Sequence, residues 1–273
     1  MRQIWNTNRQ PKVLLVDMYS DRPRDVVISV YDWKKKDTIY SKQSATVNGN
    51  DQFEISLPVT PDKAFFEITP AVGGLLGGLP KGLTVSLRED KYEPRWSCAY
   101  NQDPQLQDFL RFASWFSEHA GILSSAYGKE PASIYQSVSG KFRIRYVPEI
   151  IEDEKYFNVN GQKVLNPLYG QPSPTSLRVH SISKEIEAAQ KYVKTYTFPQ
   201  RMALLVHEYA HEYINVNPDD EQEADRNSIL ILRCLGFSKR EIGTAFTTVF
   251  KRWDSDENAA RALAVVSLLK SLP

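Results

Sequence analysis

The residues with the clearest chemical potential lie in the segment His207-Glu208-Tyr209-Ala210-His211. On a helix, two histidines four residues apart point to one face and lie one turn apart. This spacing suits two corners of a tetrahedral zinc site, and the glutamate between them stands beside the open coordination position, where a water is activated. By composition alone, the pattern arises by chance in about one protein of this size in a hundred. It therefore predicts a zinc site with Glu208 as a general base.

The helix after the motif is expected to supply the third metal ligand. Asn217-Pro218 is a typical pair for the N-cap and first position of a helix. We therefore expect one helix to end near Ile214 and the next to span residues 218–235. If these helices fold back as an antiparallel pair, residues equally distant from residue 216 lie opposite each other.

This register places Glu221 opposite His211 and Asp225 opposite His207. Glu221 and Asp225 are four residues apart and share one helix face. Glu221 is therefore the expected third ligand, and Asp225 is expected to accept the outer N–H of a ligand imidazole. Glu223 is the alternative third ligand. It points about 200° away from Glu221 around the helix, so both cannot face the metal, and it also suits the acidic first turn of a helix.

HExxH followed by Glu221-Gln-Glu-Ala-Asp225 resembles the pattern of the gluzincin zinc metallopeptidases, in which HExxH precedes ExxxD. The resemblance covers about residues 105–235 and implies a minimal zincin. It implies that His207, His211 and Glu221 bind Zn²⁺, that Glu208 is catalytic and that Asp225 supports a ligand. Two features differ from the family pattern. The gap from His211 to Glu221 is shorter than is usual in these peptidases. The group of gluzincins that the motif resembles most has membrane-spanning helices, and this sequence lacks them. The chain is also weakly similar to zincin-like proteins of tailed phages.

The implied activity is that of a zinc metalloendopeptidase, which hydrolyses peptide bonds with a zinc-activated water. Glu208 would take a proton from this water and pass it to the leaving amine. Residues 176–181 are the expected edge strand, which would pair with an extended peptide or protein substrate. A second stabiliser of the oxyanion is also needed. The candidates for it are Tyr213, Arg226, His180, Tyr192 and Tyr196.

Composition and charge argue against several other classes of protein. The net charge of +1 argues against a nucleic-acid partner. No apolar run approaches the roughly 20 residues of a membrane-spanning helix, and no secretory signal is visible. We therefore expect a cytoplasmic or virion-associated protein without a membrane span. Cys98 and Cys234 are expected to be separate buried thiols, which fits a reducing compartment.

The sequence pattern changes after Pro94. Residues 12–95 contain short runs rich in Val, Ile, Phe and Tyr, some of which alternate with period two as half-buried strands do. Asn48-Gly49 predicts a tight hairpin turn between two of these runs. We therefore predict a β-rich, sandwich-like module over residues 1–95, which is either a platform for the rest of the chain or a docking site for a protein partner.

Residues 96–273 are predicted to form a zincin-like, mainly helical metallopeptidase domain, so the whole chain belongs to the α+β class. Helical spacing of apolar residues predicts a helix over residues 105–120, ended by Gly121. A second helix is expected over residues 183–192, with Glu185 and Glu187 on its wet side.

A non-enzymatic role is the alternative to peptide hydrolysis. In that case zinc braces a structural component of a larger assembly, for example a phage virion. The intact Glu208 argues against this role, because a purely structural zinc has no use for it. A non-peptidase metal hydrolase such as a deformylase predicts a different third ligand, and neither cysteine lies in a motif that supports one.

Overall fold

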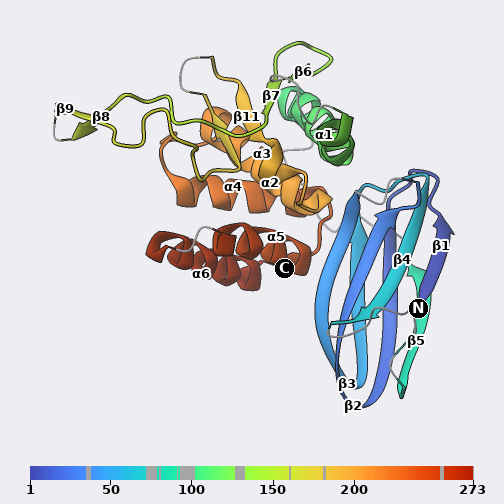
Figure 1. Cartoon of the computed structure of the whole chain (residues 1–273). Helices are drawn as coiled ribbons and strands as arrows, with labels where there is room; N and C mark the ends of the chain where they lie inside the picture. The colour runs from blue at the N-terminus through green and yellow to red at the C-terminus, as the bar shows by residue number, and fades with distance from the viewer. Residues whose placement is uncertain are drawn as a thin grey trace.

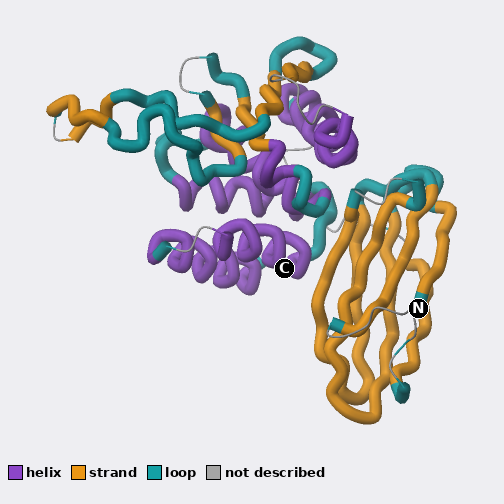
Figure 2. Tube along the Cα trace, in the orientation of Figure 1, coloured by secondary structure: helices purple, strands orange, loops and turns teal. Residues whose placement is uncertain are grey.

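The structure is a computed structural model of the chain (Figure 1). It describes residues 1–34, 38–71, 79, 81–90, 92, 102–126, 133–159, 161–180, 183–252 and 255–272. Sheets and helices are both present, which confirms the α+β class. Strands β1–β5 come first in the chain, and helices α3–α6 come last (Figure 1). Figure 2 shows the long strands gathered in one part of the molecule and the helices in another. The predicted boundary at residue 95 lies outside the described residues.

The N-terminal strands form one five-stranded sheet instead of two separate ones. They are β1 (Arg2–Asn6), β2 (Lys12–Asp32), β3 (Ile39–Leu57), β4 (Lys63–Pro70) and β5 (Leu83–Asp90). β3 pairs with β2 along most of its length, while β5 pairs with the first half of β2 and β4 with the second half. Val16 and Ile28, from the two halves of β2, are fully buried in the same hydrophobic core.

β2 and β3 are much longer than the short runs that the sequence predicted. Asn48-Gly49, predicted to be a hairpin turn, lies within β3. The register between the strands shifts between Ser20 and Arg24, next to this dipeptide. Gly49 has a φ of 76°, which glycine adopts without the steric penalty of a side chain. The dipeptide therefore belongs to an irregularity in a continuous pair of strands, and the hairpin prediction is wrong.

A second sheet of four short strands lies near the helices. Its strands are β6 (Ser133–Gln136), β7 (Arg143–Val147), β10 (Leu177–Val179) and β11 (Ile186–Ala189). The order is β10-β11-β7-β6, so β10 lies at an edge. This agrees with the edge strand expected over residues 176–181, although β10 is shorter and residues 181 and 182 lie outside the described part. Away from this sheet, a hairpin is formed by β8 (Tyr156–Val159) and β9 (Gln162–Leu165) (Figure 1).

The helix expected over residues 183–192 is mostly a strand. Its central part is β11, which is buried throughout between β7 and β10, and only the end joins a short helix. Glu185 and Glu187 are buried and form ion pairs with Arg143 and Arg178 of the neighbouring strands. Pairing on both edges therefore outweighs the helical preference of the Ile-Glu-Ala-Ala sequence.

Six helices occur in the described part of the chain. They are α1 (Pro104–Ala126), α2 (Gln190–Val193), α3 (Phe198–Tyr213), α4 (Glu221–Cys234), α5 (Lys239–Arg252) and α6 (Asp256–Ser271). α1 continues through Gly121, where it was expected to end. α3 is central, because it contacts α1, α4, α5 and the edge strand β10. It begins with a capping box between Thr197 and Gln200 and with a proline in its first turn, both of which favour helix initiation.

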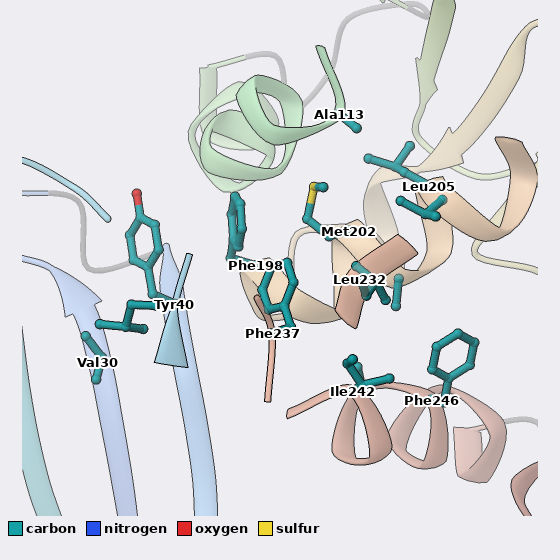
Figure 3. Close-up of a cluster of buried hydrophobic side chains, with 14 of the residues drawn as sticks. Val30, Tyr40, Ala113, Phe198, Met202, Leu205, Leu232, Phe237, Ile242 and Phe246 are labelled. Atoms are coloured by element: carbon teal, nitrogen blue, oxygen red, sulfur yellow. The ribbon is translucent and has the colours of Figure 1, made fainter. Parts of the chain in front are cut away.

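An apolar junction joins the N-terminal sheet to the helices. Figure 3 shows Val30 and Tyr40 of the sheet near Phe198 at the start of α3 and Phe237 after α4. The rings of Tyr40 and Phe198 stack with their centroids 5.4 Å apart, and Phe198 also stacks on Phe237. Since aromatic burial contributes strongly to packing, the sheet anchors the first turn of the helix that carries the motif.

Cys234 at the end of α4 is disulfide-bonded, so the expectation of a separate thiol there is wrong; Cys98 lies outside the described residues. Among the described helices, none is both long and apolar enough to cross a membrane.

A buried carboxyl group lies where α5 packs against β3. Glu241 is 4% exposed, and its Oε2 accepts hydrogen bonds from the backbone N–H and the hydroxyl of Ser238. Its Oε1 has no hydrogen-bond partner among the described residues. Burial raises the pKa of Glu241 to about 8, and the hydrogen bonds from Ser238 oppose this shift only in part. The carboxyl group therefore keeps its proton near neutral pH.

We expect Glu241→Gln to raise the free energy of unfolding by about 1–3 kcal/mol at pH 8. The folded pKa lies above the unfolded value, so the fold loses stability as pH rises from about 4.5 to about 8. Glutamine resembles the protonated carboxyl group and removes this loss. Urea unfolding between pH 5 and pH 9 measures the difference, with Glu89→Gln as an exposed control. The same pH dependence in the wild type and in Glu241→Gln would contradict the prediction.

Candidate metal centre

The two histidines of the motif lie one turn apart on α3, with their rings nearly perpendicular. Their Nε2 atoms are 2.9 Å apart. The Nδ1 atom of His211 lies 2.6 Å from the carbonyl oxygen of Pro218, and Nδ1 of His207 lies 3.0 Å from Oδ1 of Asp225. An acceptor at Nδ1 favours the tautomer with its proton there, which leaves the lone pair on Nε2. Both histidines thus present a ligand nitrogen to the same point.

Glu221, the first residue of α4, completes the cluster. Its Oε2 lies 3.1 Å from Nε2 of His207, and its Oε1 lies 3.6 Å from Nε2 of His211. A tetrahedral zinc ion with bonds of about 2.0–2.1 Å separates its ligand atoms by about 3.3 Å, which lies within the observed range. Two imidazole nitrogens facing each other at 2.9 Å require a proton or a metal ion between them. The donor set and its spacing therefore fit a zinc ion.

The predicted register between the two helices is present, although the predicted start of the second helix is wrong. Asp220, and not Asn217, is the N-cap of α4, and its side chain accepts a backbone N–H of the first turn at 2.9 Å. The Asn217 side chain instead accepts the backbone N–H of Asp219 within the turn. Glu221 and Asp225 still face the histidines, because their positions depend on the helix pairing and not on the identity of the cap.

Glu223, the alternative third ligand, has a different role. Its carboxylate accepts the backbone N–H groups of Val216 and Asn217 at 3.1–3.3 Å. These contacts close the turn between α3 and α4. The structure therefore brings Glu221, and not Glu223, to the two histidines.

Asp225 is buried behind His207, and its contact with Nδ1 is close but poorly aligned for a hydrogen bond. Both of its oxygens accept hydrogen bonds from Arg261 of α6, at 2.7 and 2.8 Å. A third nitrogen of Arg261 lies 2.8 Å from Oε2 of Glu221. Arg261 was missed by the sequence analysis, because one arginine on an amphipathic helix carries no signal by itself.

The cluster is strongly polarised by its carboxylates. Burial disfavours the charged form of His207, but Asp225 and Glu221 outweigh it and raise the pKa of His207 to about 9. Burial opposes the charged form of Glu221 as well, yet contacts with the histidines and Arg261 hold the pKa of that carboxyl well below its ordinary range. The negative potential of these carboxylates, which retains protons on the imidazoles, also attracts a divalent cation. Protons and a metal ion would therefore compete for the same nitrogens.

Glu208 lies in the wall of a cleft with a volume of about 770 Å³, which is also lined by the two histidines, Glu221 and residues 174–179. The side chain is buried. Burial raises the pKa of Glu208, while the neighbouring histidines oppose the shift in part. Glu208 therefore lies beside the cluster of His207, His211 and Glu221, with a carboxyl group that is easier to protonate than an exposed one.

The edge strand β10 presents part of its backbone to this cleft. Ser176 and His180 exchange backbone hydrogen bonds with the β11 side. Because backbone groups alternate in direction along a strand, those of Leu177 and Val179 face away from β11. The carbonyl oxygen of Leu177 accepts a hydrogen bond from the hydroxyl of Thr175 at 2.7 Å, so the N–H of Leu177 and the carbonyl group of Val179 are the groups that a peptide could pair with. Val179 and Glu208 line the same cleft, and β10 contacts α3, so this edge faces the helix that carries the motif.

None of the five candidates for the oxyanion stabiliser is among the residues that line the cleft. Tyr213 packs against Tyr209, and Tyr196 forms a hydrogen bond with Ser176. Tyr192 lies against Arg252, Arg226 lines a different cavity, and His180 pairs with Asp153 at 2.9 Å. The cationic side chains that do line the cleft, Arg178, Lys184 and Arg261, each have carboxylate partners.

Comparisons with protein-family models, with curated proteins and with solved structures found no match. The function of this chain must therefore be inferred from the geometry of its site.

We expect protein purified without added zinc to contain about one equivalent of the metal. Glu221→Ala should lose most of it, because two imidazoles alone bind zinc weakly. Glu223→Ala is the matched control: it should keep the metal and lose about 1 kcal/mol of stability through the turn. Metal analysis of the three proteins measures this. Zinc retained by Glu221→Ala but lost from Glu223→Ala would contradict the assignment.

Proposed function

We propose that this chain is a zinc-dependent metallopeptidase of the gluzincin type, which hydrolyses peptide bonds in extended segments of a protein substrate. The observation that carries the proposal is the position of Glu208. It lies buried beside three converging metal-ligand side chains, in a cleft bordered by a free strand edge. A metal, a base and a surface for an extended chain are the three requirements of this reaction.

His207, His211 and Glu221 would hold the zinc ion. Two imidazoles and one carboxylate form a typical donor set of catalytic zinc sites, which leave one position open. When bound, zinc supplies a Lewis acid that lowers the pKa of water towards neutral and polarises a carbonyl group. Asp225 would keep the His207 ring oriented through its outer nitrogen, which lies 3.0 Å away.

Glu208 would act as the general base and then as the general acid. Its carboxylate would accept a proton from the attacking water and deliver it to the nitrogen of the leaving amine. Burial raises the pKa of Glu208, which makes its carboxylate a better proton acceptor than that of an exposed glutamate. The same shift helps the group to retain the proton until the amine leaves.

The substrate would bind as an extended strand along β10. The N–H of Leu177 and the carbonyl group of Val179 face the edge away from β11, and pairing with them would hold a peptide across the cleft. The side chain of Arg178 lines the cleft, but its guanidinium group is already engaged, because it donates to Glu187 at 2.9 Å and to the carbonyl oxygen of Ile151 at 3.0 Å. Recognition through the backbone favours unstructured segments over folded domains.

A structural role is the second candidate, in which the chain is a zinc-braced component of a larger assembly such as a phage virion. One observation favours it: of the described residues in β1–β5, none lines the cleft. The large N-terminal sheet is therefore available for a protein partner instead of the substrate. Glu208 opposes this role, since a bracing metal requires no buried base beside it.

We expect Glu208→Gln to keep its zinc and to lose at least about 100-fold in the rate of cleavage of an unstructured protein, because a carboxamide cannot accept the proton. Glu67→Gln, which makes the same change in the distant N-terminal sheet, should cleave like the wild type. Release of new amino termini from reduced, alkylated casein measures the rate. Zinc-loaded wild type without activity, or with activity that Glu208→Gln shares, would favour the structural role.

A further inference from the structure

Arg261 is the residue through which the last helix of the described chain reaches the metal-ligand cluster. Its Nε and one terminal nitrogen donate to the two oxygens of Asp225, at 2.7 and 2.8 Å. Its other terminal nitrogen lies 2.8 Å from Oε2 of Glu221. The side chain is only 13% exposed, and its guanidinium group lies 4.6 Å from the ring centroid of Phe250. These contacts hold the group in one orientation.

The residues that Arg261 contacts differ in how well the rest of the fold fixes them. The Glu221 side chain is 42% exposed and lies at the first turn of α4. A glutamate in that setting has several accessible rotamers, so a partner is needed to keep its carboxylate beside the histidines. Asp225 is buried, and its charge requires a paired cation. Arg261 meets both requirements with one side chain.

The shape of the guanidinium group suits this double contact. Glu221 and Asp225 are four residues apart on one helix, so their carboxylates lie about one turn apart. The planar fork of an arginine can donate to both, whereas the ammonium group of a lysine is a single point of charge. The contact is therefore specific for arginine, and not merely for a positive charge.

We propose that Arg261 is a positioning residue of the metal centre. It holds the carboxylate of Glu221 towards His207 and His211, and it holds Asp225 behind His207. Helix α6 thereby sets the affinity for zinc, although it supplies no ligand. This inference rests on the proposed zinc site and adds a residue that acts on the metal only through other side chains.

The test is the zinc affinity of the full-length, metal-free protein, measured by competition with a chromophoric chelator. Arg261→Met should bind zinc about 10–100-fold more weakly, as is usual when support for a zinc ligand is removed. Lys270→Met, an exposed change on the same helix, should bind zinc within about twofold of the wild type. Zinc affinity of Arg261→Met within the same twofold range would overturn the proposal.

Two further variants separate positioning from a general loss of packing. In a cycle with Asp225→Asn, Arg261→Met should weaken zinc binding less than it does in the wild-type background, because part of its effect passes through Asp225. Fully additive effects would overturn the proposal. If Arg261→Met fails to fold, Arg261→Lys keeps the charge but not the fork. It should still bind zinc at least about tenfold more weakly, and affinity equal to the wild type would overturn the proposal.

The same titrations distinguish this proposal from the proposed function. Wild-type protein that binds no zinc would contradict the peptidase proposal, and this inference would fail with it. Wild-type protein that binds zinc, together with an Arg261→Met variant that binds equally well, would leave the peptidase proposal intact and contradict only the role of Arg261.

Discussion

The site depends on one geometric constraint: two imidazole nitrogens must face the same point at close range. Two ring nitrogens whose lone pairs face each other at 2.9 Å repel unless a proton or a cation lies between them. The fold keeps them there by holding their outer nitrogens, one against the carbonyl oxygen of Pro218 and one beside Asp225. Both of these groups lie on or before α4. The packing of α3 against α4 is therefore the interaction on which the cluster depends, and the apolar junction at Phe198 fixes the start of α3.

The part of the site that follows from the sequence is the part set by short-range geometry. The two histidines share a helix face because of the helical period, and the short connection forces the next helix to return alongside. Those two facts place Glu221 and Asp225 opposite the histidines even though Asp220, and not Asn217, is the true cap. The error in the cap shifts the helix start by three residues and leaves the pairing unchanged. The role of Glu223 also follows from the helical period. Its position around α4 directs its carboxylate to the turn between α3 and α4 and away from the histidines.

The features that were missed are set by contacts between distant segments. β11 carries a sequence with helical preference, but it is buried between two strands, and that pairing decides its structure. Arg261 lies 36 residues from Asp225, and only the packing of α6 against α4 brings it to the site. The disulfide bond at Cys234 also joins distant segments, and the spacing of cysteines in a sequence does not specify which of them pair. The full length of β2 and β3 was not predicted, because each strand continues only where it pairs with the other.

The balance of charge around the cluster bears on whether its metal would brace the fold or take part in chemistry. A structural zinc is usually enclosed by four protein ligands, whereas the cluster within the described residues offers three. Asp225 and Glu221 have Arg261 as a counter-charge, but Glu208 has no lysine or arginine partner in the described part of the chain. A buried, ionised carboxyl group without such a partner destabilises the fold. Burial therefore raises the pKa of Glu208, so the group takes up a proton more readily. A carboxyl group of this kind beside a cleft, next to three ligand side chains, supports the proposed proton transfer more than the structural alternative.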